Sequence, residues 1–335
     1  MAAVDPILPR MPGSRWVMRR LAGGVVTVAI VVTLTFILIH AAPGSPLTAL
    51  EERQVPPEVA ERLRRDFGLD QPLPVQFGRW VLRLARADLG VSLSQHRPVT
   101  AVLADALPHT LLLSGAAVLL MFGLGIGIAL VQGRYPRTRL DHALSWVSVT
   151  LFSTPVFWLG AMLLAAFAVG TGWFPVGGAR DVLLRSDAGI GVRLLDRLHH
   201  LVLPAVTLGL AGAGLVARYQ RTALFDVLAQ DFLRTARAKG LSPRAVLLRH
   251  ALPNALLPTI TILGLIVPAL LSGAVLVETV FAWPGMGRLT ADAILRRDYP
   301  VVVGASLVAA VFVVLSTLVA DLLVRWADPR TREAA

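Results

Sequence analysis

Long apolar segments recur along the whole sequence. Six of them can be traced, at residues 21–42, 107–131, 144–169, 201–216, 255–277 and 301–324. Most contain the roughly 20 residues that an α-helix needs to cross the hydrocarbon core of a bilayer. Because that core offers no water to backbone N–H and C=O groups, only helices and closed barrels span it. The segments therefore predict an all-α polytopic membrane protein with six transmembrane helices, in agreement with a hydrophobic content of 55%.

Basic residues indicate which side of the membrane each connecting segment occupies. They are denser at the two ends of the chain and in segments 132–142 and 217–253 than in the alternate segments. Because positively charged loops stay on the cytoplasmic side, both termini and the 217–253 loop are expected in the cytoplasm. The first apolar segment is longer than the core of a signal peptide, which has about 7–15 residues. We therefore expect it to remain as the first transmembrane helix.

The alternation of polar and apolar stretches predicts four regions. They are a basic N-terminus with the first transmembrane helix (1–42), an extracytoplasmic helical segment (43–101), a core of five transmembrane helices that includes the cytoplasmic loop 217–253 (102–328), and a C-terminal tail (329–335). Within 43–101, one helix is expected to begin at Pro56 and Pro57. A second should carry Phe77, Trp80, Val81 and Leu84 on one face, suited to packing on the membrane surface or on a neighbouring span.

Two positions within the core predict interruptions of helices. Thr154 and Pro155 lie inside the third apolar segment, where proline should kink or loosen the helix. In the basic loop, residues 224–239 contain neither glycine nor proline and favour a single helix. Gly240 can end that helix, and Ser242 with Pro243 can begin the next as N-cap and first helical residue. We expect a helix, a glycine turn and a second helix.

This loop resembles the cytoplasmic signature of ABC-importer permeases, known as the EAA loop. The family pattern has Glu-Ala-Ala, then Gly four residues later, then Ile and Leu-Pro. In this chain the second alanine (Ala236), Gly240 and Leu252-Pro253 match, whereas Arg234, Thr235 and His250 replace the Glu, the first Ala and the Ile. The core from Arg234 to Leu241 is similar to the version in dipeptide, oligopeptide and nickel permeases. Positive charge on a cytoplasmic loop explains its arginines, but not its glycine or its Leu-Pro.

The resemblance assigns functional roles to two sets of residues. In the family the loop forms a coupling helix that docks on a partner ATPase. The residues of this chain that would make the coupling site are Thr235, Ala236, Arg237, Lys239, Gly240, Leu241, Leu252 and Pro253. A second family-like segment contains Glu278, Trp283, Pro284 and Gly285, and its Trp-Pro-Gly turn is expected at the outer membrane interface, where aromatic side chains anchor proteins.

Further family-like stretches extend the resemblance over nearly the whole chain. They are 68–74, 88–92 and 328–330. The resemblance implies a permease subunit in the bacterial inner membrane that forms the translocation path of an ATP-driven importer for peptides or a related small solute. It also implies four kinds of partner: a second permease in a heterodimer, two ATPase subunits, an extracytoplasmic solute-binding protein and the lipid bilayer.

If transport is driven by ATP, the sequence indicates that another chain binds the nucleotide. A P-loop requires Gly-Lys followed by Ser or Thr, and the only lysine, Lys239, precedes Gly240. ATP and Mg²⁺ are therefore expected on a partner ATPase, with no cofactor, metal site or catalytic residue in this chain. We expect a transport subunit and not an enzyme. The net charge of +11 lies in loops beside membrane spans, where membrane orientation explains it better than nucleic acid.

Other function classes remain as alternatives to this hypothesis. An ion-coupled secondary carrier or channel usually holds ionisable groups inside the membrane, and the middle of these six segments has no Asp, Glu, Lys or Arg. A membrane subunit without a transport role is the other alternative. Nickel capture by His199 and His200 is a minor one, because adjacent residues on a helix face different ways. The sequence does not select the solute among peptides, nickel chelates and other small molecules.

Overall fold

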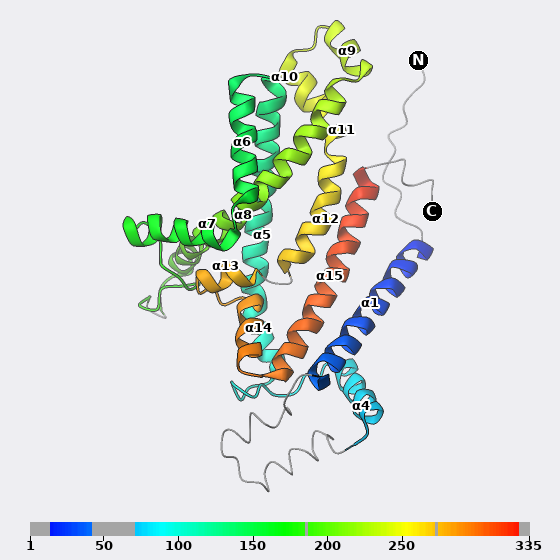
Figure 1. Cartoon of the computed structure of the whole chain (residues 1–335), viewed down its shortest axis with the longest axis vertical. Coiled ribbons are helices and arrows are strands. Elements are labelled where there is room, and N and C mark those ends of the chain that lie inside the picture. Colours follow the sequence, from blue (N-terminus) through cyan, green and yellow to red (C-terminus); the bar gives the residue numbers. More distant parts are fainter. Residues whose placement is uncertain (1–13, 42–70, 185–186, 272–273, 328–335) are drawn as a thin grey trace.

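A computed structural model describes residues 14–41, 71–184, 187–271 and 274–327, and these ranges form a bundle of helices (Figure 1). The helices are α1 (Ser14–Ala41), α4 (Leu73–Ala85), α5 (Val99–Arg134), α6 (Arg139–Ser153), α7 (Val156–Leu163), α8 (Ile190–Leu228), α9 (Asp231–Ala238), α10 (Pro243–Ala245), α11 (Leu252–Ala255), α12 (Leu257–Leu271), α13 (Val275–Val280), α14 (Met286–Leu295) and α15 (Tyr299–Ala327). Two π-helical turns, Leu164–Gly170 and Val246–Ala251, continue α7 and precede α11.

The predicted class of an all-helical membrane protein is confirmed. The helices α1, α5, α8 and α15 are each long and apolar enough to cross a membrane, and two bent pairs raise the number of candidate spans to six. The helices α9 and α10 lie at one end of the bundle, towards which α15 runs, while α4 and α14 lie at the opposite end (Figure 1). By the charge argument above, the α9 end faces the cytoplasm.

The third apolar segment is broken more sharply than a kinked helix. The first half ends at Ser153, Thr154 is extended, and Pro155 precedes α7. Proline disfavours the helical conformation of the residue before it, which explains the break. The two halves meet at 103°, so this segment is a broken span or a re-entrant loop. The prediction of an interruption at Thr154 and Pro155 is confirmed.

Small residues allow α5, α6 and α8 to approach closely. A Cβ atom added at Gly125 of α5 would lie 2.6 Å from Val216 Cβ of α8, and one added at Gly214 would overlap the Ser148 carbonyl oxygen of α6. Lipid tails are as apolar as helix surfaces, so close packing of this kind is a main source of attraction between transmembrane helices. Gly123, by contrast, has no atom within 4 Å of the position that a Cβ would take.

The extracytoplasmic segment is described only from residue 71 onwards. The helix expected to begin at Pro56 lies outside the described residues, as do the tail 329–335 and the 328–330 stretch. The second expected helix is α4. Its Phe77 and Trp80 rings lie 5.2 and 5.3 Å, centroid to centroid, from Phe36 of α1. The aromatic face of α4 therefore packs on a neighbouring span, which is one of the two placements that its pattern predicted.

We expect Gly214→Ala to destabilise the protein, because the new methyl group would overlap a backbone carbonyl that cannot rotate away. Overpacking of this kind costs about 1–3 kcal/mol. Gly123→Ala is the matched control, since its methyl group meets no atom within 4 Å. Thermal unfolding of the two purified variants in mild detergent tests the expectation. Equal midpoints would contradict the close contact between α6 and α8.

Candidate functional site

The basic loop forms a short helix followed by a glycine turn. Residues Ala229 and Gln230 separate α8 from α9, so the single helix expected over 224–239 is wrong: the chain forms two helices there. Gly240 ends α9 with φ +79°, and its N–H donates to the Arg237 carbonyl at 2.9 Å. This left-handed conformation favours glycine because it has no Cβ. The predicted glycine stop is confirmed.

The second helix begins as its residues indicated. The Ser242 hydroxyl accepts a hydrogen bond from the Ala245 N–H at 3.3 Å, and Pro243 occupies the first helical position. A π-helical turn follows, and α11 then leads into α12. The loop is therefore a folded projection between α8 and α12, and its position at one end of the bundle is visible in Figure 1.

An apolar cluster holds this projection against the bundle. Its buried members are Leu224, Val227, Leu233, Ala236, Val246, Leu247, Ala251 and Ala255. They come from α8, α9, the π-helical turn and α11, so every part of the projection except α10 contributes to the cluster. The projection is thus fixed to the end of α8 by burial of apolar surface.

The expected coupling residues divide between an outer and an inner face. The exposed ones are Thr235, Arg237, Lys239, Gly240, Leu241 and Pro253. Ala236 is buried in the apolar cluster at 8% exposure, and Leu252 is half-buried. Ala236 and Leu252 therefore shape and support the projection from within, and the other six are available to a partner.

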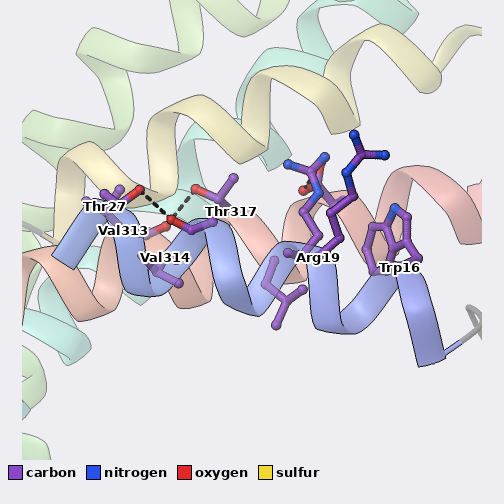
Figure 2. A pocket seen from close by; sticks show the side chains of 11 residues that line it. Trp16, Arg19, Thr27, Val313, Val314 and Thr317 are labelled. Carbon is purple, nitrogen blue, oxygen red and sulfur yellow. Dashed lines mark hydrogen bonds and ion pairs between the residues drawn. The ribbon is translucent and has the colours of Figure 1, made fainter. Parts of the chain in front are cut away.

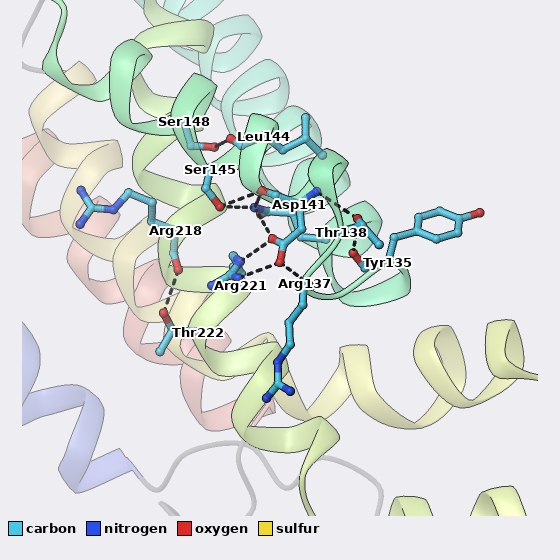
Figure 3. A network of polar contacts seen from close by, with 11 residues as sticks. Tyr135, Arg137, Thr138, Asp141, Leu144, Ser145, Ser148, Arg218, Arg221 and Thr222 are labelled. Atoms are coloured by element: carbon cyan, nitrogen blue, oxygen red, sulfur yellow. Dashed lines mark hydrogen bonds and ion pairs between the residues drawn. The ribbon is translucent and has the colours of Figure 1, made fainter.

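A partly buried ion pair, in which the Arg221 side chain is 34% exposed, joins α8 to α6 close to the start of the projection (Figure 3). The Arg221 guanidinium donates from Nε and Nη2 to the two carboxylate oxygens of Asp141, both at 3.0 Å. Asp141 lies in the first turn of α6 and is 1% exposed. It also accepts from the Gln132 side chain of α5 and from the Arg137 N–H. One carboxylate thus joins α5, α6 and α8.

The sequence pattern did not predict this ion pair. A local signal was present, because Thr138 and Asp141 have the spacing of a capping box before an apolar helix, and Thr138 caps α6 in the structure. Nothing in that pattern indicates that the partner of Asp141 is Arg221, which lies 80 residues later.

The residue before Arg221 ties α8 to the other flank of the projection. The Gln220 side chain donates to the Ala255 carbonyl at 3.1 Å and accepts from the Thr259 hydroxyl. Gln220 and Thr259 are 0% and 1% exposed. Buried hydrogen bonds of this kind are costly to break without replacement. The projection therefore sits between two polar contacts, a partly buried one to α6 and a buried one to α12.

The second family-like segment lies at the opposite end of the bundle and is also buried. Glu278 is 0% exposed and accepts from the Thr110 hydroxyl at 3.1 Å and the Arg288 N–H at 2.8 Å. Burial raises the pKa of Glu278, and these hydrogen bonds oppose the increase. A Cβ at Gly285 would overlap the Glu278 carboxylate, so the turn needs a glycine there.

The expectation that the Trp-Pro-Gly turn anchors the protein at the membrane interface is wrong for its tryptophan. Trp283 is 0% exposed, and its Nε1–H donates to the His109 carbonyl of α5 at 3.0 Å. Its ring belongs to a core cluster with Leu113 and Phe281. Trp283 therefore fixes the segment after α13 to α5, while Glu278 does so through Thr110.

At the same end of the bundle, the Asp298 carboxylate links the start of α15 to residues 92–94, a contact that the sequence pattern did not predict. Asp298, before α15, accepts from the Ser92 and Ser94 hydroxyls and from the N–H groups of Leu93 and Ser94. It is 0% exposed. Burial would raise its pKa, but these four hydrogen bonds outweigh burial and lower it. Ser92 belongs to the family-like stretch 88–92. This stretch therefore binds the residue that precedes α15.

The two adjacent histidines have separate partners. His199 Nε2 lies 2.7 Å from the Trp173 carbonyl oxygen, and His200 Nδ1 lies 2.9 Å from the Asp196 carbonyl oxygen. In the described part of the chain, no three His, Cys, Asp or Glu side chains are grouped as a metal site would require. Both histidines act in helix and loop packing.

Two protein-family models match the chain, one after the other. Residues 14–114 match the N-terminal model of binding-protein-dependent transport system membrane components, and residues 111–333 match the model of their inner membrane component. The chain belongs to this family of permeases.

Curated relatives place this permease in the oligopeptide and dipeptide branch of the family. It is 38% identical to the oligopeptide transport system permease AppB of Bacillus subtilis, over 89% of this chain and 92% of the relative. It is 41% identical to the di/tripeptide permease DppB of Pseudomonas aeruginosa, over 95% and 98%. The identity to the probable D,D-dipeptide permease DdpB of Escherichia coli is 42%, over 93% and 96%.

A solved structure confirms the fold independently. The permease resembles a chain of the inward-facing MetNI methionine ABC transporter with a TM-score of 0.55 and 18% identity, over 69% of this chain and 98% of that chain. At this identity the likeness shows the fold alone. Family membership makes the protein a multi-pass transport component of the bacterial inner membrane, without a catalytic domain and served by a separate ATPase.

We expect Arg221→Gln to destabilise the permease by about 1–3 kcal/mol, because it leaves the buried Asp141 carboxylate without its partly exposed cation. The double variant with Asp141→Asn should recover part of this loss, since neither side chain then carries an unpaired charge. Thermal unfolding in detergent measures both. Arg234→Gln is the control, because its ion pair with Asp231 is exposed at both ends and worth little. A double variant no more stable than Arg221→Gln would contradict the assigned pair.

Asp298 predicts sensitivity to acid. Its folded pKa lies below its unfolded value, so the carboxylate stabilises the fold above that unfolded value and loses the contribution as the pH falls through the folded pKa. The window therefore begins near pH 4, the ordinary value for aspartate. Unfolding midpoints of the native protein should fall between about pH 5 and pH 3 more steeply than those of Asp298→Asn. Parallel profiles would exclude Asp298 as the cause.

Proposed function

We propose that this permease forms half of the translocation path of an ATP-driven importer for di- or oligopeptides or a closely related small solute. Relatives named for oligopeptides, di/tripeptides and D,D-dipeptides support the peptide class, at 38–42% identity over most of both chains. A relative named for glutathione, itself a tripeptide, is 38% identical over 95% of this chain. The shared chemistry of these solutes is a short peptide backbone.

The proposed complex contains a second permease, paired with this one as a heterodimer, two ATPase subunits and an extracytoplasmic solute-binding protein. The ATPases hold ATP and Mg²⁺. In this division of labour, 102–328 forms the transmembrane core with loop 217–253 on the cytoplasmic side. Region 1–42 supplies the first helix, 43–101 faces the extracytoplasmic side, and 329–335 is the cytoplasmic tail.

The projection from α9 to α11 is the proposed contact with an ATPase. Its exposed side presents Arg237 and Lys239 around the Gly240 turn, with Leu241 beside it. Basic side chains around an apolar contact suit a partner surface of opposite charge. The observation that carries the proposal is that this exposed turn stands on an apolar cluster and is flanked by the Gln220 and Arg221 contacts.

The Gln220 and Arg221 contacts would transmit a movement of the projection to the transmembrane helices. When a docked ATPase closes on ATP, a displacement of α9 would be transmitted to α6 through Asp141 and to α12 through Thr259. A packed body with buried polar contacts moves between discrete arrangements more readily than it deforms. The proposed switch is thus between inward-facing and outward-facing arrangements of the same helices.

We expect Gly240→Val to lower peptide uptake at least tenfold while the protein still inserts into the membrane. Valine disfavours φ +79°, although no atom lies within 4 Å of the added Cβ, so the effect is on the turn and not on packing. Gly240→Asn is the matched control, since asparagine tolerates the left-handed region and should retain most uptake. Uptake of a labelled dipeptide and copurification of the ATPases measure the two effects.

The two readouts separate the parts of the proposal. Normal uptake by Gly240→Val would remove the coupling role of the turn. Uptake that continues after ATP depletion would instead favour an ion-coupled carrier. Wild-type protein that copurifies with ATPases but does not take up any dipeptide or tripeptide would keep the coupling role and exclude the peptide assignment.

A further inference from the structure

A groove of about 570 Å³ lies between α1 and α15, away from the proposed coupling site (Figure 2). Its lining residues are Trp16, Arg19, Arg20, Gly23, Gly24, Thr27, Val313, Val314, Thr317, Leu318 and Asp321. Trp16 and Arg19 lie at one end of the groove, and Thr27 and Thr317 lie at the other (Figure 2). One end of the groove is therefore charged, and the other carries no charged side chain.

Two neighbouring glycines give the groove a floor and an opening. Gly24 is buried, and a Cβ added to it would lie 2.5 Å from Val314 Cγ1, so α1 and α15 touch there. Gly23 is exposed and has no atom within 4 Å of an added Cβ. The space above Gly23 is open although the two helices are in contact beside it.

The charged end has an excess of positive charge. Arg20 pairs with Asp321 at 2.8 Å, and Arg19 is a second lining cation. Asp321 is the single acidic residue in the lining, so positive charge is in excess at this end. The Trp16 ring lies 5.7 Å from the guanidinium carbon of Arg20 and 4.4 Å from that of Arg325. This end matches a singly charged phosphodiester.

The position of the groove along the membrane normal matches a phospholipid. In α1, residues 21–39 carry no charged side chain, a length of about 29 Å at 1.5 Å per residue. In α15, residues 299–320 carry none, about 33 Å. Because the hydrocarbon core is about 30 Å thick, Arg20 and Asp321 lie at its cytoplasmic boundary. Gly23 to Thr27 and Val313 to Leu318 lie at the depth of the acyl chains.

We propose that this groove binds one anionic phospholipid of the cytoplasmic leaflet. The phosphodiester lies against Arg19 and Arg20 with Trp16 beside it, and an acyl chain follows the open face above Gly23. Basic pockets between transmembrane helices on this side of a membrane favour anionic headgroups. A soluble phosphate compound would satisfy the charged end but would leave the apolar half of the groove empty, so the occupant is a lipid.

Native mass spectrometry of the full-length protein tests the proposal. The protein is delipidated in mild detergent and titrated with phosphatidylglycerol or with phosphatidylcholine of the same acyl chains. We expect one saturable phosphatidylglycerol site, at least fivefold tighter than for phosphatidylcholine. Glycerol 3-phosphate, which has no acyl chain, should not compete. Equal affinity for the two lipids, or displacement by glycerol 3-phosphate, would overturn the proposal.

Two variants with matched controls locate the site. Arg19→Gln should weaken phosphatidylglycerol binding about fivefold, the effect of one arginine near a membrane surface. Gly23→Leu should abolish the site by filling the open space. Arg139→Gln at the cytoplasmic end of α6 and Gly123→Leu on the exposed face of α5 make the same changes elsewhere. Unchanged binding in Arg19→Gln, or in a monodisperse Gly23→Leu protein, would overturn the proposal.

A crosslinking experiment in native membranes distinguishes the lipid from a protein neighbour. Thr27, which lines the groove and is exposed, is replaced with photoreactive p-benzoylphenylalanine. We expect adducts with phospholipid, detected by mass spectrometry of the tryptic peptides. An adduct with the second permease in place of lipid would show that a protein covers the groove, and would overturn the proposal.

Discussion

The contact between α5 and α8 is the interaction on which the rest of the permease depends. Within a bilayer, helices gain little from the hydrophobic effect on meeting one another, so small residues and polar contacts decide which helices associate. Gly125 lies against Val216 in this contact. The buried polar groups then lie towards the two ends of the same pair of helices: Thr110 of α5 binds Glu278, and Arg221 of α8 binds Asp141. The two faces of the membrane are thereby connected through one rigid pair.

The helices of this permease could be predicted from sequence because they depend on local properties. Apolar length identified the spans, Pro155 identified a break, and Gly240 identified a turn whose φ of +79° only glycine adopts readily. The 103° angle at Thr154 could not be predicted, since proline restricts the residue before it without setting the direction of the next helix. The break between α8 and α9 could not be predicted because neither glycine nor proline occurs at Ala229 and Gln230 to mark it.

The contacts that organise the candidate site depend on residues that are distant in sequence. Arg221 had an adequate explanation as a cytoplasmic loop charge, and Asp141 as a capping residue of α6. Only the fold shows that they meet in a partly buried ion pair. Trp283 was misjudged in the same way, because a tryptophan beside a span is as consistent with an interfacial anchor as with a core residue. Its hydrogen bond to the His109 carbonyl decides between them.

The helix α1 lies at the periphery of the bundle and is held by different contacts from those of the core helices. The core helices are held by buried carboxylates and amides, whereas α1 meets α15 at Gly24 and through the ion pair of Arg20 with Asp321 at its cytoplasmic end. Only 6% of the residues in the most apolar stretch of α1 are buried. The open space beside Gly23 lies between this peripheral helix and α15, and we propose that lipid fills it in the membrane. Arg19 and Trp16 then decide which lipid is preferred, since their charge and aromatic face lie at the depth of the headgroups.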